Sequence, residues 1–176
     1  MVKEIPKAII VEKVVITEES DLARDLYANH RFGNIKRQKV EMSFIEAFYL
    51  VEKKKLQIVD SREKNIDFDK LLKKFIRLET DFFVRYKVFA DMRDRGYIIK
   101  TALKFGAEYR VYDKGVKPGE DHAKWILYPV READKLTWFE FSSKNRVAHS
   151  TKKKLLLGIV DAEGDVTYYE VGWVRP

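Results

Sequence analysis

The chain has 176 residues and no cysteine, with 35 lysine and arginine residues against 28 aspartate and glutamate residues, a formal charge of +7. This length allows one domain or two small ones with a buried core. The charge favours a polyanion such as nucleic acid as partner, although many soluble basic proteins bind none. Disulfides and thiolate metal sites are excluded. No apolar run approaches the about 20 residues of a membrane span, and the start lacks a signal-peptide core, so we expect a cytoplasmic protein.

The amino-terminal half alternates between strand and helix patterns. Ser43 and Glu46 have the spacing of a capping box, in which each side chain satisfies a free backbone N–H group at the start of a helix. Gly96 is expected to end the last helix of this half. The expected elements are a strand at 8–17, helices at 18–29 and 44–53, a strand at 56–60, and helices at 67–77 and 79–95. We place a domain boundary near residue 84.

The carboxy-terminal half is rich in strand patterns. The candidates are 97–103, 108–112, 125–130, 137–141, 155–161 and 166–174, and a loop with a short helix at 146–154 interrupts them. A central mixed sheet with flanking helices follows from this order. The predicted fold class is α+β, with a small amino-terminal α/β domain at 1–84 and a second α/β domain at 85–176.

A phenol, an imidazole and an ammonium group occur near loops in the carboxy-terminal half. Tyr112 ends a short strand, and a turn with Pro118 and Gly119 leads to His122 just before the next strand. These two side chains are expected at the two rims of one loop, where they can face a common phosphate. Together with a lysine they provide the base, the acid and the cation that metal-free cleavage of an RNA phosphodiester needs. The alternative is a stacked strand tyrosine and a solvent-exposed turn histidine.

Several short motifs in the chain are specific only in combination. They are RDRGY at 93–97, KFG at 104–106, YRVY at 109–112, KPG at 117–119, RVAHS at 146–150 and KKKLLL at 152–157, with a looser match, SFIEAFYL, at 43–50. This set resembles the archaeal tRNA-splicing endonucleases, the tRNA-intron endonuclease family. The resemblance implies that residues 85–176 form the nuclease domain, with a restriction-nuclease-like mixed sheet.

By this resemblance, Tyr112, His122 and Lys153 occupy the catalytic positions, at intervals of 10 and 31 residues. The implied reaction cuts intron-containing pre-tRNA at both intron borders within a bulge-helix-bulge, where shape and unpaired bases are read. The 2′-hydroxyl of the substrate attacks, which leaves 2′,3′-cyclic phosphate and 5′-hydroxyl ends. We assign Tyr112 as general base, His122 as general acid and Lys153 as the cation that stabilises the transition state. The scheme requires no metal and no cofactor.

The role of the phenol stays open at this point. An ordinary tyrosine side chain is protonated at neutral pH, because its reference pKa is about 10. Either a neighbouring lysine or basic loop makes the phenol a base, or Tyr112 only orients the 2′-hydroxyl.

Two positions are expected to hold a bulged base. Arg146 matches the place where members of the family stack an arginine on the base, since a guanidinium plane can stack while charged. The partner position near the carboxyl end is arginine in some members and falls nearest Trp173 here, with Arg175 adjacent. Trp173 could stack in the same way, or it could fill an interface.

An acidic turn contains Asp161, Glu163 and Asp165 and reads as a hairpin tip. In the family such a loop docks into a basic cleft of a neighbouring subunit. Because this chain carries both the catalytic set and the acidic turn, the resemblance implies a homotetramer that assembles through the acidic turn and the carboxy-terminal strands. A catalytic subunit paired with a separate structural subunit is the alternative.

The sequence leaves two rival functions to consider. A non-catalytic RNA-binding or structural subunit of such an endonuclease would have lost part of the catalytic set, and none is missing. A metal-dependent DNA nuclease would need paired carboxylates and a lysine on a strand, and the sequence offers no convincing set.

Two further histidines have separate interpretations. His149 lies near Lys153 in the sequence and could neighbour the phosphate, whereas His30 is expected in a surface turn.

Overall fold

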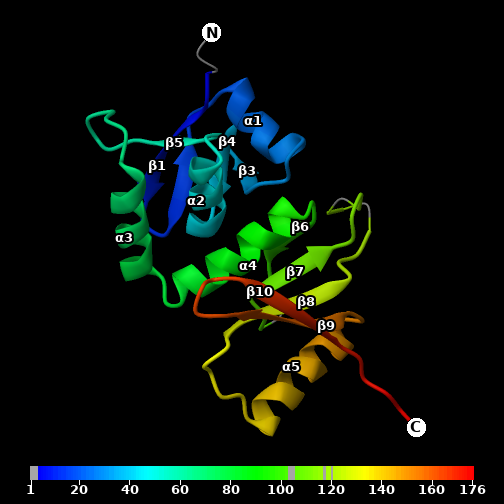
Figure 1. Ribbon diagram of the computed structural model, residues 1–176. Coiled ribbons are helices and arrows are strands. Elements are labelled where there is room, and N and C mark those ends of the chain that lie inside the picture. The colour runs from blue at the N-terminus through cyan, green and yellow to red at the C-terminus, as the bar shows by residue number, and fades with distance from the viewer. Residues whose placement is uncertain (1–3, 103–105, 117, 120) are drawn as a thin grey trace. The chain divides into compact units, whose positions relative to one another are not determined.

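The computed structural model describes residues 4–102, 106–116, 118–119 and 121–176. Within these residues the chain forms five helices and ten strands, which divide into an amino-terminal unit, Met1–Phe82, and a carboxy-terminal unit, Phe83–Pro176. Each unit contains a five-stranded mixed sheet, which confirms the predicted α+β class (Figure 1). No helix in the described part of the chain is long and apolar enough to cross a membrane.

The amino-terminal unit packs its helices on one face of its sheet. The elements are β1 (Lys7–Val11), β2 (Val14–Thr17), α1 (Asp21–Ala28), β3 (Asn34–Lys36), β4 (Lys39–Met42), α2 (Phe44–Glu52), β5 (Gln57–Ile58) and α3 (Phe68–Leu78). The strand order is β3-β4-β2-β1-β5, and only the β1–β5 pair is parallel. Alternate strand residues such as Ala8, Val15 and Val40 are buried, and the aromatic rings of Phe44 and Phe75 stack at 4.5 Å between centroids in the core beneath.

The predicted capping box at the start of α2 is present and does more than cap the helix. The Ser43 side chain accepts a hydrogen bond from the Glu46 N–H, and the Glu46 carboxylate accepts one from the Ser43 N–H at 3.1 Å. Glu46 is 7% exposed and also accepts from the Gly33 N–H at 2.9 Å. Gly33 has a φ of +61°, and a Cβ there would lie 2.5 Å from the Glu41 carbonyl oxygen. This close approach explains why a glycine precedes β3.

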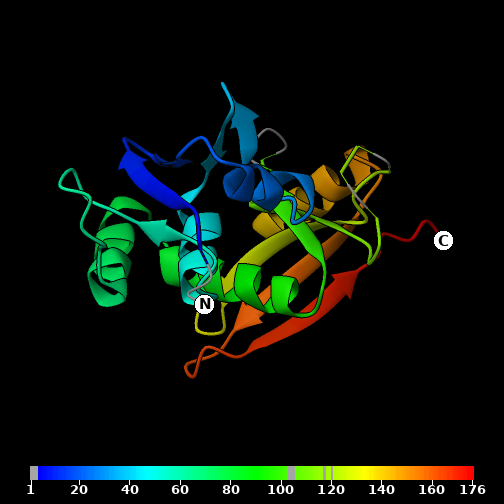
Figure 2. The ribbon, with the colours of Figure 1, turned by 90° about the horizontal axis from the view of Figure 1, so that it is seen from above.

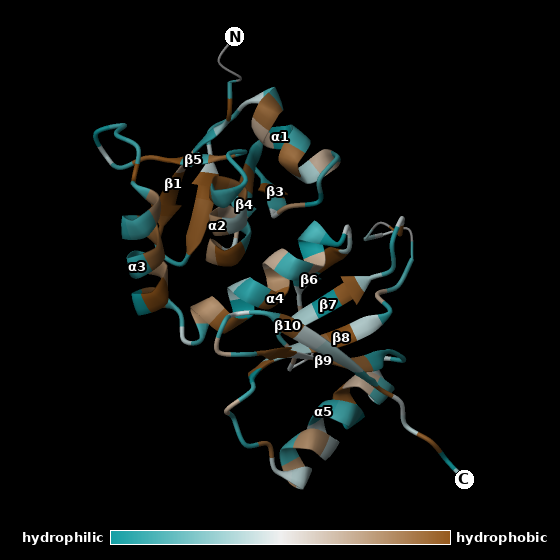
Figure 3. Cartoon of the chain, in the orientation of Figure 1, coloured by the Kyte–Doolittle hydropathy of each residue, from teal (hydrophilic) through white to brown (hydrophobic). Residues whose placement is uncertain are grey.

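The carboxy-terminal unit has three layers, with one helix on each face of its sheet (Figure 1). The elements are α4 (Phe82–Asp94), β6 (Ile98–Thr101), β7 (Tyr109–Tyr112), β8 (Trp125–Arg131), α5 (Trp138–Ser150), β9 (Lys154–Val160) and β10 (Val166–Val171). The strand order is β10-β9-β8-β7-β6, and β8 and β9 are the parallel pair that α5 connects. Figure 3 shows apolar residues concentrated in the strands and polar residues in the connecting turns.

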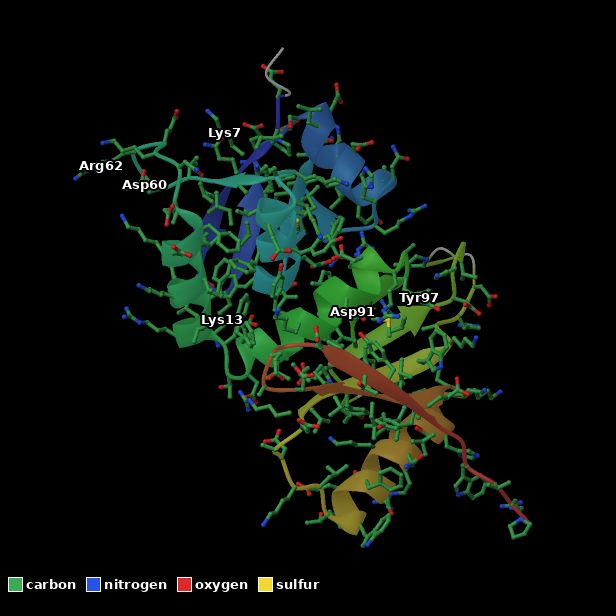
Figure 4. The ribbon with its side chains drawn as sticks, in the orientation of Figure 1. Lys7, Lys13, Asp60, Arg62, Asp91 and Tyr97 are labelled. Atoms are coloured by element: carbon green, nitrogen blue, oxygen red, sulfur yellow. The ribbon has the colours of Figure 1, made fainter. Side chains whose placement is uncertain are left out.

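Different contacts hold the two helices. On the α4 face, a Cβ at Gly158 in β9 would lie 3.1 Å from the Val88 side chain, so helix and strand pack closely. At the end of α4 itself, the Asp91 carboxylate, labelled in Figure 4, accepts a hydrogen bond from the Arg95 side chain at 2.7 Å. On the α5 face, a small apolar core joins the helix to the sheet. Its buried members are Ala102, Ala107, Ile126, Tyr128, Ala148 and Leu155.

Two sequence-based expectations about elements were wrong, and a third was confirmed in part. The strand expected at 8–17 is a hairpin, because Glu12 takes a left-handed φ of 52° between β1 and β2. The strand expected at 137–141 is the start of α5, where Thr137 and Glu140 form a second capping box. The loop and short helix expected at 146–154 are the last turns of the 13-residue α5 and the turn that follows it. The hairpin of β3 and β4 had no sequence-based counterpart.

Candidate active site

The connectivity of the carboxy-terminal sheet brings three distant segments to one end of it. Tyr112 is the last residue of β7, His122 lies three residues before β8, and Lys153 immediately precedes β9. Because β7 runs antiparallel to β8 while β8 runs parallel to β9, the end of β7 and the starts of β8 and β9 share one end of the sheet. We call this the loop end of the sheet. All three residues predicted to be catalytic therefore have their backbones at the loop end.

Lys124 links the segments at this end through its backbone. Its N–H donates to the Val111 carbonyl at 2.9 Å, and its carbonyl accepts from the Lys154 N–H at 3.0 Å. Tyr112 on one side and Lys153 on the other therefore lie beside Lys124. Neighbouring strands are about 4.8 Å apart, so the backbones of Tyr112 and Lys153 are about 10 Å apart. Since strand side chains alternate between faces, Tyr112 and Lys153 both belong to the face that α5 covers.

The three side chains have different surroundings. Tyr112 is 4% exposed, and the Arg110 guanidinium carbon lies 5.9 Å from its ring centroid. His122 is exposed, and its backbone N–H donates to the Asp121 carboxylate at 2.6 Å. Lys153 is half-buried, and its ammonium group donates to the Thr151 carbonyl at 2.8 Å. The site therefore combines a fixed phenol, an accessible imidazole and an anchored cation. Residues 117 and 120 of the connecting loop lie outside the described residues.

A basic groove lies at the end of α5, and we call it the lysine groove. It has a volume of about 780 Å³. Its lining residues are Lys124, His149, Ser150, Lys152, Lys153 and Lys154. The predicted catalytic lysine thus shares its groove with three other lysines, two of which, Lys152 and Lys154, are its direct neighbours in the chain.

Two carboxylates hold two of these lysines. Lys124 donates to Asp113 at 3.0 Å, and Lys154 donates to Glu170 at 2.5 Å. Glu170 also accepts from the Trp125 indole N–H at 2.7 Å. The hydrogen bond from Lys154, with that from Trp125, lowers the pKa of the Glu170 carboxyl below its ordinary value, and the hydrogen bond from Lys124 does the same for the pKa of Asp113. Both carboxylates therefore stay charged at neutral pH and fix the two ammonium groups.

A second groove, which we call the α5 groove, runs between α5 and the segment after β10. It has a volume of about 770 Å³, and Arg146, His149 and Trp173 are among its lining residues. The Trp173 ring is 59% exposed and meets the His149 ring edge to face at 4.5 Å between centroids, while the Arg175 guanidinium lies 5.5 Å from the same indole. The structure therefore brings the predicted base-stacking residues Arg146 and Trp173 to one groove. His149 and Ser150 line both grooves.

The acidic turn forms the tip of the β9–β10 hairpin (Figure 2). The Asp165 N–H donates to the Asp161 carboxylate at 2.8 Å, and the Asp161 N–H donates to the Asp165 carbonyl at 3.1 Å. Gly164 has a φ of +86°, and a Cβ there would lie 2.8 Å from the Lys87 side chain of α4. One acidic side chain thus closes the turn, while Glu163 and Asp165 are exposed at its tip.

Two models of one protein family match the chain. The model described as "tRNA intron endonuclease, catalytic C-terminal domain" matches residues 82–168. The model described as "tRNA intron endonuclease, N-terminal domain" matches residues 7–72. This chain belongs to the tRNA intron endonuclease family. The match confirms the resemblance seen in the sequence motifs. The match to the C-terminal domain spans the positions of Tyr112, His122, Arg146 and Lys153 and ends before Trp173.

Curated relatives cover nearly the whole chain. The tRNA-splicing endonuclease of Pyrococcus horikoshii is 41% identical over 164 residues, which are 93% of this chain and 93% of the relative. The tRNA-splicing endonuclease of Nanoarchaeum equitans is 44% identical over 152 residues, 82% of this chain and 97% of the relative. That of Methanothermobacter thermautotrophicus is 38% identical over 167 residues, 94% and 95% of the two chains. These tRNA intron endonuclease relatives therefore resemble both units of the chain.

The sequence did not reveal the residues that organise the lysine groove. Lys124 is a single lysine before a strand, and Asp113 and Glu170 are separated from their lysine partners by 11 and 16 residues. The run of lysines at 152–154 was the only available signal, because the other contacts depend on the register of β7, β8, β9 and β10.

Proposed function

We propose that this protein is a tRNA-splicing endonuclease that cuts intron-containing pre-tRNA at the borders of its intron, within a bulge-helix-bulge. The observation that carries the proposal is that the backbones of Tyr112, His122 and Lys153 lie at the same loop end of the sheet. Their residue types match a reaction in which the RNA supplies its own nucleophile. The names of the relatives support the substrate class. We further propose that the protein acts in the cytoplasm.

In the proposed reaction, Tyr112 takes the proton of the 2′-hydroxyl, whose oxygen attacks the neighbouring phosphorus. The bond from phosphorus to the 5′-oxygen breaks, and His122 donates a proton to that oxygen. The Lys153 ammonium group stabilises the charge that grows on the phosphorane. The products are a 2′,3′-cyclic phosphate and a 5′-hydroxyl. These steps use only acid–base chemistry and a fixed cation, so we propose that cleavage requires no divalent metal.

The surroundings of each residue suit these roles. The exposure of His122 lets its imidazole reach a leaving oxygen, and the hydrogen bond from Lys153 to Thr151 fixes the cation. Tyr112 is almost fully buried, so its ring is held in one orientation. A fixed phenol suits a general base and equally a group that only orients the 2′-hydroxyl. Both roles require Tyr112 at the same place.

We propose that Arg146 and Trp173 hold a bulged base in the α5 groove. Both residues line this groove, and the exposed indole of Trp173 offers a stacking surface next to the Arg175 guanidinium. Stacking on an aromatic or guanidinium plane is how proteins bind unpaired RNA bases. The alternative, in which Trp173 fills an interface between copies of the chain, would leave the base to Arg146 alone.

We propose that the protein is a homotetramer that assembles through its acidic turn and its carboxy-terminal strands. The exposure of Glu163 and Asp165 at the hairpin tip supports the proposal, because charge pairs register interfaces and weaken with salt. Replacing Asp161, Glu163 and Asp165 with serine should leave a dimer. Light scattering that finds an intact tetramer for this triple variant would refute the docking role. Loss of the tetramer should also abolish paired cutting at two sites.

The activity is tested by incubating the purified protein with an intron-containing pre-tRNA in excess EDTA. We expect two cuts, a released intron, and ends that carry a 2′,3′-cyclic phosphate and a 5′-hydroxyl. Strict dependence on Mg²⁺, or 3′-hydroxyl ends, would contradict the proposed chemistry. Binding without any cleavage would instead favour a non-catalytic subunit of such an endonuclease.

A further inference from the structure

The lysine groove contains more positive charge than the proposed cleavage step uses. One ammonium group, that of Lys153, is enough to stabilise the phosphorane, yet Lys124, Lys152 and Lys154 line the same groove. Like charges gathered in one groove repel one another and need a compensating anion. The structure therefore raises the question of what the other three lysines bind.

Part of the compensation comes from the protein. Asp113 holds the ammonium group of Lys124, and Glu170 holds that of Lys154. The end of α5 contributes as well, because the carbonyl end of a helix attracts cations. The Lys152 N–H donates to the His149 carbonyl at 3.0 Å, and the Lys153 N–H to the Ala148 carbonyl at 2.8 Å.

Lys152 differs from its neighbours in its backbone. It has a left-handed φ of 56°, which a non-glycine residue adopts only at some cost, and its side chain is exposed on the groove. This turn reverses the chain between the end of α5 and the start of β9. The three consecutive lysines at 152–154 all line the lysine groove at this end of the sheet.

The two grooves also meet at the last turn of α5. His149 and Ser150 line both of them, so the lysine groove lies next to the α5 groove that contains Arg146 and Trp173. An RNA strand with a base in the α5 groove has its adjoining backbone within reach of the lysines. Lysine binds phosphate as a compact point charge and needs no special geometry.

From this arrangement we propose that the lysine groove contains a second phosphate subsite, in which Lys152 and Lys154 bind a backbone phosphate of the RNA next to the phosphate that is cut. Lys153 serves the cut phosphate itself. The Lys124 carbonyl and the Glu170 carboxylate set the position of Lys154 at the start of β9. The subsite rests on the proposed function, since the same RNA has to occupy both positions.

An acidic protein segment is the other occupant with suitable charge. It would cover Lys153 and so block the proposed catalytic position, and this conflict favours RNA. If a copy of the acidic turn nevertheless binds in the lysine groove, removing lysines from it changes the mass of the assembly.

The test measures RNA affinity as a function of salt. The probe is a bulge-helix-bulge RNA with 2′-deoxynucleotides at both cut positions, titrated with wild-type protein and with the double variant Lys152→Gln/Lys154→Gln at several NaCl concentrations. Each lost phosphate contact lowers the slope of log affinity against log salt by about 0.7–0.9. We expect weaker binding and a slope smaller by that amount, with a lesser effect on the single-turnover rate at saturating enzyme.

The matched control is the double variant Lys74→Gln/Lys135→Gln, because both lysines are exposed outside the two grooves and their removal costs the same two charges. A slope for Lys152→Gln/Lys154→Gln equal to that of Lys74→Gln/Lys135→Gln overturns the subsite. So does an altered assembly mass with unchanged RNA affinity, or a loss that falls entirely on the rate at saturation.

The same experiment separates this inference from the proposed function. Wild-type protein is assayed in parallel on the all-ribose RNA. If it cuts while the slopes agree, the subsite fails and the endonuclease stands. If it does not cut while the slopes differ, the endonuclease proposal fails and the phosphate subsite stands.

Discussion

The two sheets of this protein each contain five strands and one parallel pair, but the pair lies in different places. In the amino-terminal unit, β1 and β5 are parallel over two residue pairs at the margin of the sheet. In the carboxy-terminal unit, β8 and β9 are parallel over seven residue pairs near its centre, with α5 between them in the chain. A central parallel pair sets two strand starts side by side, and an antiparallel neighbour adds the end of a third strand. This is how residues 41 positions apart, Tyr112 and Lys153, reach one place.

The carboxylates of the two units also have different hydrogen-bond partners. In the amino-terminal unit, the buried Glu46 carboxylate accepts hydrogen bonds from backbone groups and so stabilises the fold. In the carboxy-terminal unit, Glu170 and Asp113 are at the surface and hold lysines beside the lysine groove. We therefore expect changes in the amino-terminal unit to act mainly on stability, and changes at the loop end of the carboxy-terminal sheet to act mainly on RNA binding and cleavage.

The largest effect is expected from His122→Ala. General acid catalysis contributes about 10²–10⁴ in rate, so the single-turnover rate should fall by about 100-fold or more. RNA affinity and melting temperature should stay close to wild type, because His122 is exposed. Near-normal cleavage at saturating enzyme would reject His122 as a catalytic group.

A smaller loss is expected from Arg146→Ala in the α5 groove. Stacking of one base is worth about 1–3 kcal/mol by alanine substitution, so cleavage of a bulged substrate should weaken by about 5- to 150-fold. Trp173→Ala tests the proposed partner in the same assay, and Arg175→Ala serves as the neighbouring comparison. If rate and affinity are unchanged for Arg146→Ala, this arginine is a surface residue without a role in recognition.

The amino-terminal unit is tested by Glu46→Ala. The change leaves the N–H groups of Gly33 and Ser43 without their acceptor, and an unsatisfied buried group costs about 1–3 kcal/mol. We expect a lower free energy of unfolding in urea and normal cleavage per folded molecule. Glu52→Ala, an exposed glutamate of the same helix, is the control and should change little. Equal unfolding curves for the two variants would show that Glu46 does not hold the unit together.

The smallest effect concerns the pH dependence of stability at Glu170. Because the pKa of this carboxyl is lower in the folded protein than its ordinary value of 4.5, its contribution to stability is present above that value and is lost as the pH falls through the folded pKa. Glu170→Gln should therefore lower the melting temperature slightly at pH 7. The difference should shrink as the pH is lowered below about 4.5. A constant difference at all pH values would mean that the carboxylate charge is not responsible.

Capping chemistry shows how far the sequence predicts this fold. Ser43 and Glu46 correctly predicted the start of α2, and the same spacing at Thr137 and Glu140 was the overlooked signal for α5. The aromatic alternation after Thr137 favoured a strand instead, although the cap satisfies backbone groups that a strand start would leave open. The β3–β4 hairpin was missed because Arg37 and Gln38 adopt left-handed φ values without a glycine or asparagine to mark the turn.

The sequence likewise predicted one part of the candidate site and not the other. The motifs indicated the candidate catalytic residues, and the turn residues between Tyr112 and His122 predicted that these two lie at the two rims of one loop. The lysine groove could not be predicted, because Lys124 meets Lys154 only through the parallel register of β8 and β9. Register depends on packing across the whole sheet, which local sequence patterns do not contain.

The most direct test of the central claim removes the nucleophile from the substrate. A bulge-helix-bulge RNA with a single 2′-deoxynucleotide at one cut position is incubated with wild-type protein, and both positions are followed in the same molecule. We predict that the all-ribose position is cut and carries a 2′,3′-cyclic phosphate, while the 2′-deoxy position stays intact although the RNA is bound. Cleavage at the 2′-deoxy position would contradict attack by the 2′-hydroxyl and with it the roles given to Tyr112, His122 and Lys153.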